Sequence, residues 1–144
     1  MGLKDWLRLT RAEHGFIVFL AVVVSQFVVT KKLDSSFFFP ALGPLLITWG
    51  AFAWGDYFGL KSDTFLGRDS LPLVSGKIKP RHALWVGAFL MLTGAGLTFF
   101  VNAPAFAMAL AYTAGAMAYD PVLKKRPLLG NAFIASSMAV LSLP

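Results

Sequence analysis

Two aspartates behind an apolar run are the residues of this chain best placed to do chemistry. Asp56 and Asp63 are seven residues apart in residues 55–81, GDYFGLKSDTFLGRDSLPLVSGKIKPR, the longest polar interruption in the sequence. If the apolar helix before them continues through Asp63, both carboxylates lie on nearly the same face, about 10 Å apart along the axis. That distance is too long to chelate one Mg²⁺ together. It suits two carboxylates that each hold a metal ion on either side of a diphosphate.

Bases near these acids could bind the remaining diphosphate oxygens through charge-assisted hydrogen bonds. The candidates are Arg68 and Lys77 in the same polar stretch, and Lys124 and Lys125 in a second polar loop, residues 120–130. The alternative is that all of these are ordinary interfacial charges whose side chains reach into lipid headgroups. Spacing alone leaves both interpretations open.

The composition places these polar stretches in a membrane protein. Of the 144 residues, 57% are hydrophobic and 14% are charged, whereas a soluble domain carries about 25% charged residues. The apolar residues come in blocks rather than at helical or strand periods. The chain has no cysteine, which excludes disulfides, Cys-based zinc sites and thiol nucleophiles. The net charge is +6, but the bases lie beside the apolar runs, so we do not expect nucleic acid as a partner.

The apolar blocks predict an all-α, integral membrane helical bundle with four full transmembrane helices and an incomplete fifth. The fifth would begin at Asn131 and has fourteen residues, which reach about 21 Å and fall short of the roughly 30 Å hydrocarbon core. We therefore expect residues 1–144 to form a single membrane domain that is a fragment or half of something larger. The four full spans are predicted over residues 15–30, 37–54, 82–101 and 104–119.

The distribution of Lys and Arg predicts the orientation in the membrane. If the four spans alternate, eleven of the thirteen bases fall on one side and only Lys31 and Lys32 fall on the other. The positive-inside rule then places the N-terminus and both polar loops, about residues 55–81 and 120–130, in the cytoplasm.

Two segments indicate how the helices begin and pack. Residues 2–12 can form an amphipathic helix in the membrane interface, with Leu3, Trp6 and Leu7 on its apolar face. Small residues in the third span would let a neighbouring helix approach closely. These residues are Gly87, Gly94 and Gly96.

Several segments, in order along nearly the whole chain, resemble motifs of the UbiA-type intramembrane prenyltransferases. The resemblance at both ends of the chain is strongest to the archaeal lipid-synthesis members of that family. The segments are RAEHG at 11–15, DYFGLKSD at 56–63 followed by Arg68, PLVSG at 72–76, YDPVLKK at 119–125 and LGN at 129–131.

The chain also departs from the family's first signature, N-D-x-x-D-x-x-x-D. Gly55 stands in place of the leading Asn and Gly59 in place of the second acid, so that only Asp56 and Asp63 remain of three acids. Family members run to about twice this length, with roughly nine spans, and carry a second aspartate signature that has no counterpart here. The resemblance therefore implies the first half of a UbiA-like fold with a partly lost metal site.

The resemblance implies Mg²⁺-dependent transfer of a prenyl group from a prenyl diphosphate to an aromatic or glycerol-phosphate lipid acceptor. Asp56 and Asp63 would hold the metal, and a second chain or copy would complete the bundle within the lipid bilayer. The residues implied in diphosphate binding are Arg68, Lys77, Tyr119, Lys124 and Lys125, with Tyr57, Asp69 and His14 as further candidates.

Two other functions stay open at this point. A non-catalytic relative with a decayed metal site could bind an isoprenoid or a partner protein. The losses at Gly55 and Gly59 favour this alternative, whereas the retained bases favour catalysis. A small transporter formed by dimerisation is the third hypothesis, and the lack of ionisable residues in the middle of the predicted spans argues against it.

Overall fold

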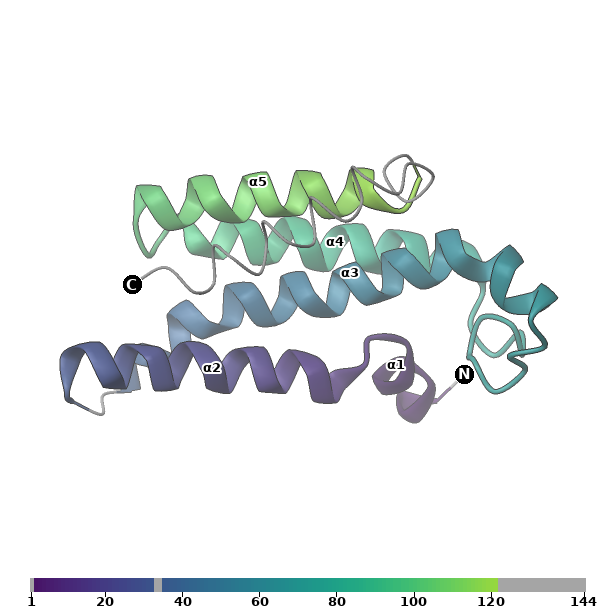
Figure 1. The fold of residues 1–144 in the computed structure, drawn as a ribbon, viewed down its shortest axis with the longest axis horizontal. Coiled ribbons are helices and arrows are strands. Elements are labelled where there is room, and N and C mark those ends of the chain that lie inside the picture. Colours follow the sequence, from purple (N-terminus) through teal and green to yellow (C-terminus); the bar gives the residue numbers. More distant parts are fainter. Residues whose placement is uncertain (1, 33–34, 122–144) are drawn as a thin grey trace.

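The computed structural model describes residues 2–32 and 35–121, and the regular structure within these ranges is entirely helical (Figure 1). The all-α prediction is thereby confirmed for this part of the chain. The predicted fifth span, residues 131–144, lies outside the described residues. The helices are α1 (Leu3–Leu9), α2 (Ala12–Thr30), the short 3-10 helix η1 (Ser35–Phe37), α3 (Phe38–Phe65), α4 (Pro80–Thr98) and α5 (Ala103–Tyr119).

The four long helices coincide with the four predicted spans, with one large difference. The span predicted over residues 37–54 continues as α3 to Phe65, so the first part of the polar stretch is helix and only residues 66–79 connect α3 to α4. Ala12–Thr30 and Ser35–Phe65 are long and apolar enough to cross a membrane, judged by length and composition. The other two long helices, α4 and α5, have 19 and 17 residues and are not among those that pass this test, so their predicted spans stay predictions.

The helices α4 and α5 begin at residues that suit a helix start. Pro80 is the first residue of α4, where its missing N–H has no helical partner to lose. The side chain of Asn102 caps α5 by accepting a hydrogen bond from the Ala105 amide at 2.7 Å. A tight turn can therefore reverse the chain between these two helices.

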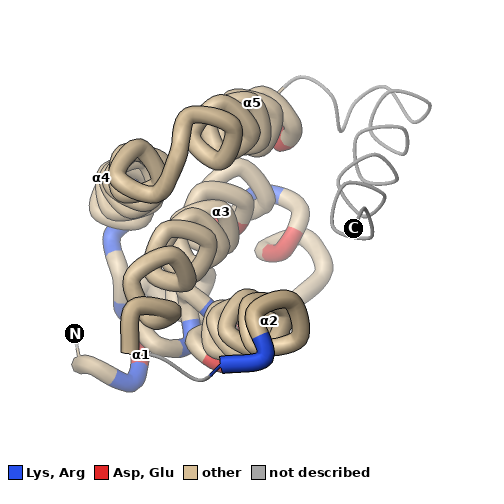
Figure 2. Tube along the Cα trace, turned by 90° about the vertical axis from the view of Figure 1, so that its left-hand side faces the viewer, with Lys and Arg blue, Asp and Glu red and all other residues tan. Residues whose placement is uncertain are grey.

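The long helices run alternately in opposite directions around α3. In Figure 1, α1, the α3–α4 connection and the end of α5 lie at one end of the bundle, and the α2–α3 and α4–α5 turns lie at the other. Figure 2 shows α3 in the centre, with α2 on one side and α4 and α5 on the other. The α3–α4 connection, which holds most of the first polar stretch, and Tyr119 at the end of α5 therefore lie at the same end.

Four glycines bring α3 and α4 into backbone contact. Gly43 faces Gly94, and Gly50 faces Gly87. A Cβ added at Gly94 would lie 2.6 Å from the carbonyl oxygen of Gly43, and one added at Gly50 would lie 2.6 Å from that of Gly87. The predicted close approach is confirmed for Gly87 and Gly94. In the described part of the chain the prediction is wrong for Gly96, which is exposed and has no described atom within 4 Å of an added Cβ.

The helix α1 is shorter than predicted and packs into the protein through Leu9. It ends at Leu9, before Arg11 adopts a left-handed backbone with φ 47°. Leu3 and Leu7, predicted on a face that lies in the membrane interface, are 76% and 44% exposed, and Leu9 is fully buried. Trp6 packs against the cluster around Leu9. The other buried residues of that cluster are Ala53, Leu73, Ile78 and Ala83.

We predict that Gly94→Ala lowers the free energy of unfolding by about 1–3 kcal/mol, because the new methyl group meets the α3 backbone and forces the helices apart. The measurement is thermal or denaturant unfolding of the protein in detergent. Gly96→Ala is the matched control, since the same substitution there meets open space. Equal unfolding midpoints for the two variants would contradict a backbone contact at Gly94.

Candidate functional site

Asp56 and Asp63 lie in the second half of α3, which confirms that the helix continues past both acids. Their spacing of two turns places them on nearly the same face. The two side chains are only 14% and 15% exposed. A carboxylate so far removed from water needs a compensating charge or hydrogen bonds. An arginine supplies this compensation at both positions.

Arg68 pairs with Asp63 because of the way α3 ends. Gly67, with φ +66°, follows the last helical residues, and its amide donates to the Thr64 carbonyl at 3.1 Å. The Arg68 amide donates to the Asp63 carbonyl at 3.0 Å. These two bonds form a Schellman-type helix end. The arrangement places Arg68 over Asp63, and its Nη1 donates to Asp63 Oδ1 at 3.0 Å.

Arg11 pairs with Asp56 from the junction of α1 and α2. Its Nη2 lies 3.6 Å from Asp56 Oδ1, and its guanidinium carbon lies 4.7 Å from the centre of the Phe52 ring. Phe52 and Asp56 are one turn apart on α3, so the cation contacts an aromatic face and a carboxylate together. A left-handed backbone is uncommon for a residue with a side chain and often marks functional sites. Arg11 was not among the predicted site residues, although its place in the RAEHG motif could have identified it.

Two of the predicted site residues near the α1–α2 junction, His14 and Tyr57, pack against phenylalanine rings of α3. His14 lies edge-on to Phe52 with ring centres 5.3 Å apart, and its Nδ1 is 3.5 Å from Glu13 Oε1. Tyr57 is half-buried on α3, where its ring packs edge-on against that of Phe58. The structure therefore brings His14 beside the Arg11–Asp56 pair.

The end of α5 reaches the same part of α3. Trp54 Nε1 donates to the Met117 carbonyl at 3.2 Å, which joins the two helices. A Cβ added at Gly55 would lie 3.1 Å from Asp120 Oδ2. Asp120 therefore occupies space beside Gly55 that a side chain at that position would need. Tyr119, the preceding residue, is half-buried at this helix end.

The remaining predicted residues are not gathered with the two acids in the described structure. Lys77 and Asp69 are exposed on the α3–α4 connection. Neither of them joins an ion pair within the described ranges, 2–32 and 35–121. Lys124 and Lys125 lie outside the described residues.

Comparison with known families covers nearly the whole chain. The model of the UbiA prenyltransferase family matches residues 15–143. The chain belongs to the UbiA prenyltransferase family. The resemblance carried by the motifs is thereby confirmed, and membership makes this a helical protein of the membrane.

Several archaeal members of the UbiA family, each named digeranylgeranylglyceryl phosphate synthase, are similar to this chain. The protein from Methanococcoides burtonii is 30% identical over 144 residues, which cover 92% of this chain and 50% of the relative. The protein from Archaeoglobus fulgidus is 33% identical over 150 residues, which cover 96% and 49%. The chain thus spans about half the length of the curated relatives it matches. No solved structure matches it significantly.

The position where the UbiA signature has its second acid lies beside Asp63. A Cβ added at Gly59 would be 3.4 Å from Asp63 Oδ2, so an acid at this position would place a second carboxylate next to the first. Among the residues that the structure describes, no group of three or more His, Asp or Glu side chains could hold a metal ion. The site therefore offers separate carboxylates, each with an arginine, rather than a preformed cluster.

Separate carboxylates still fit Mg²⁺ in chemical type. Magnesium in phosphate-binding sites keeps waters and is held by one or two carboxylates together with substrate phosphates. Asp56 and Asp63 are oxygen donors of this kind, and each already carries a cation in the form of an arginine side chain. A metal ion and its phosphate ligand could take the place of these arginines.

We predict that Gly59→Asp makes stability depend on Mg²⁺. Without the metal, two adjacent carboxylates repel each other by an amount on the order of 1–4 kcal/mol, and the unfolding temperature falls. Added Mg²⁺ should recover more of this loss than it adds to the unsubstituted protein. The measurement is thermal unfolding with and without Mg²⁺. Gly59→Asn, of equal size and without charge, is the control, and an equal response of the two variants would rule out a cation site at this position.

Proposed function

We propose that this chain forms half of a Mg²⁺-dependent UbiA-type catalyst. The catalyst would transfer a prenyl group from a prenyl diphosphate to an aromatic or glycerol-phosphate lipid acceptor. The observation that carries the proposal is the pair Asp56 and Asp63, held on one face of α3 with an arginine against each. Family membership and the relatives' names support prenyl transfer as the class of reaction.

The residues have complementary roles in this proposal. Asp56 and Asp63 would hold Mg²⁺, which when bound neutralises charge on the leaving diphosphate. Arg11 and Arg68, displaced from the carboxylates, would be within reach of the phosphate oxygens and could bind them through charge-assisted hydrogen bonds. As the bond between carbon and oxygen breaks, its electron pair leaves with the diphosphate. The acceptor then bonds to the allylic carbon and loses a proton.

Apolar surroundings would protect the cation-like carbon from water. We propose that α2, α3, α4 and α5 all span the bilayer and that the missing wall of the cavity comes from a second chain or copy. The chain spans about half the length of its relatives. Residues 1–144 would then be a single membrane domain that needs its partner half for turnover.

A non-catalytic, isoprenoid-binding relative is the second candidate. The observation that favours it is the separation of the acids, since no metal-binding group of three forms within the described residues. In that case a prenyl diphosphate would bind without being cleaved.

We further propose that the N-terminus and both polar stretches face the cytoplasm. The uneven distribution of Lys and Arg between the two sides of the membrane supports this orientation. The fold also supports it, because α1, the α3–α4 connection and the end of α5 all lie at the same end of the bundle (Figure 1). Single cysteines at Ser62 and Ser35, in a chain without any other cysteine, should react with an impermeant thiol reagent from opposite sides of sealed vesicles. Reaction of both from one side would refute the alternation of the helices.

The test of function is binding and turnover of radiolabelled geranylgeranyl diphosphate. Mg²⁺ should strengthen binding to residues 1–144, and Asp63→Asn should remove most of that gain, because a neutral amide is a poor ligand for this hard cation. Asp5→Asn is the control, since Asp5 lies on α1 and its replacement can still accept the Gly2 amide bond.

Turnover separates the two candidate functions. We expect prenyl transfer to an acceptor only when a complementary second half is supplied. Mg²⁺-dependent binding without turnover, even with the second half present, would support the non-catalytic relative. Equal binding by Asp63→Asn and the unsubstituted chain, with and without Mg²⁺, would exclude the two-carboxylate site. Robust turnover by the isolated monomer would exclude the need for a second half.

A further inference from the structure

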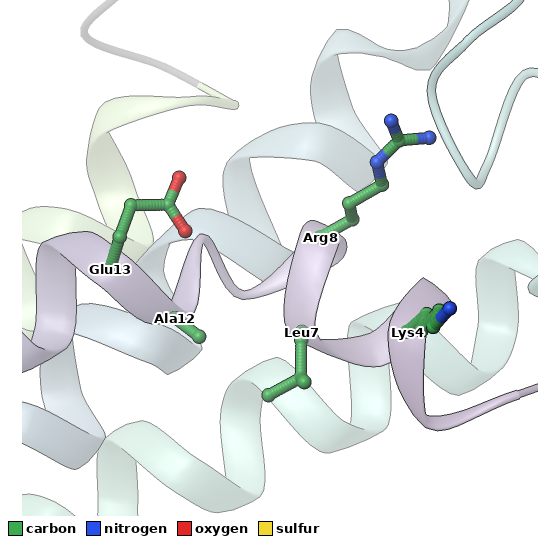
Figure 3. A pocket seen from close by; sticks show the side chains of 5 residues that line it. All are labelled: Lys4, Leu7, Arg8, Ala12 and Glu13. Atoms are coloured by element: carbon green, nitrogen blue, oxygen red, sulfur yellow. The ribbon is translucent and has the colours of Figure 1, made fainter.

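A hollow lies between α1 and the first turn of α2, and none of its lining residues belongs to an acid–arginine pair of the proposed site. Figure 3 shows its lining residues, which come from both helices. We propose that this hollow binds the headgroup of an anionic membrane lipid, with the acyl chains against the apolar edge of α1. The proposal does not depend on the proposed enzymatic function. The lining residues are Lys4, Leu7, Arg8, Ala12 and Glu13.

Two bases give the hollow its affinity for an anion. Lys4 and Arg8 are one helical turn apart, so their side chains leave α1 on the same side. Both are exposed, and neither joins an ion pair in the part of the chain that the structure describes. The acid of the hollow, Glu13, already has its carboxylate 3.5 Å from His14 Nδ1. Asp5, also on α1, accepts the Gly2 amide at 3.0 Å.

Exposed leucines beside these bases select an amphiphile over a soluble anion. Leu3 and Leu7 are 76% and 44% exposed, and Leu7 and Ala12 form the apolar part of the hollow. A phosphate bound by the two bases would leave these apolar groups in water, whereas the acyl chains of a lipid would cover them. Charge and apolar surface together therefore match a lipid.

The orientation of α1 is suited to a membrane surface. The helix lies across the direction of the long helices at the base-rich end of the bundle (Figure 1). Its buried residue, Leu9, fixes the opposite face in the cluster with Ala53, Leu73, Ile78 and Ala83, so the bases and leucines are held outward. Short helices with this division of surface lie in the interface and bind more strongly when the lipids are anionic.

The test is native mass spectrometry of the full chain in mild detergent, titrated with dioleoyl phosphatidylglycerol or with dioleoyl phosphatidylcholine. We expect tighter binding of the anionic lipid. The double variant Lys4→Gln/Arg8→Gln should weaken that binding by about tenfold to thirtyfold, from roughly 1 kcal/mol per base, and should leave the zwitterionic lipid unaffected. Leu7→Ser should weaken binding of both lipids.

The matched control is Lys31→Gln/Lys32→Gln, which removes the same charge at the opposite end of α2. It should change binding of the anionic lipid by less than about threefold, and circular dichroism should show equal helix content in all variants. The proposal is overturned if both double variants lose binding equally, or if neither does. Competition by millimolar glycerol 3-phosphate would assign the hollow to a soluble phosphate instead. Loss of a dimer rather than of bound lipid in Lys4→Gln/Arg8→Gln would assign this face to a second copy of the chain.

Discussion

The backbone contact between α3 and α4 is the constraint on which the rest of the structure depends. At the facing glycines the two backbones are in direct contact, so the helices cannot come closer together. On the other side of α3, the Trp49 ring covers Gly15 and its Nε1 donates to the Ala12 carbonyl at 3.3 Å. The acid-bearing helix is therefore fixed from two directions, and α1 and the α3–α4 connection pack around its end.

The two acid–arginine pairs have different structural origins. Asp63 and Arg68 are joined by the hydrogen bonds that end α3, so their contact needs only a few consecutive residues. The contact between Asp56 and Arg11 needs α1, α2 and α3 in their folded positions. The Arg11–Asp56 pair therefore depends on tertiary packing, and any movement of the α1–α2 junction changes the surroundings of Asp56 directly.

Local signals in the sequence predicted the helices and the two acids, because apolar blocks and motif spacing are properties of short segments. Contacts between distant segments were not predictable in this way. The partners of Gly87 and Gly94 depend on which helix lies opposite, and the burial of Leu9 depends on α3, α4 and the connection between them. The interaction of Arg11 with Asp56 joins residues on separate helices, so no local pattern contains it.

The fit between Gly55 and Asp120 also has a consequence for how this sequence can change over evolutionary time. Because the carboxylate lies 3.1 Å from where a Cβ at position 55 would be, a larger residue there requires the Asp120 side chain or the end of α5 to shift by a few tenths of an ångström. A substitution at either position therefore changes the packing at the other. Gly55 and Asp120 thus lie in two different segments that resemble the family's motifs, and the fold places these two residues side by side.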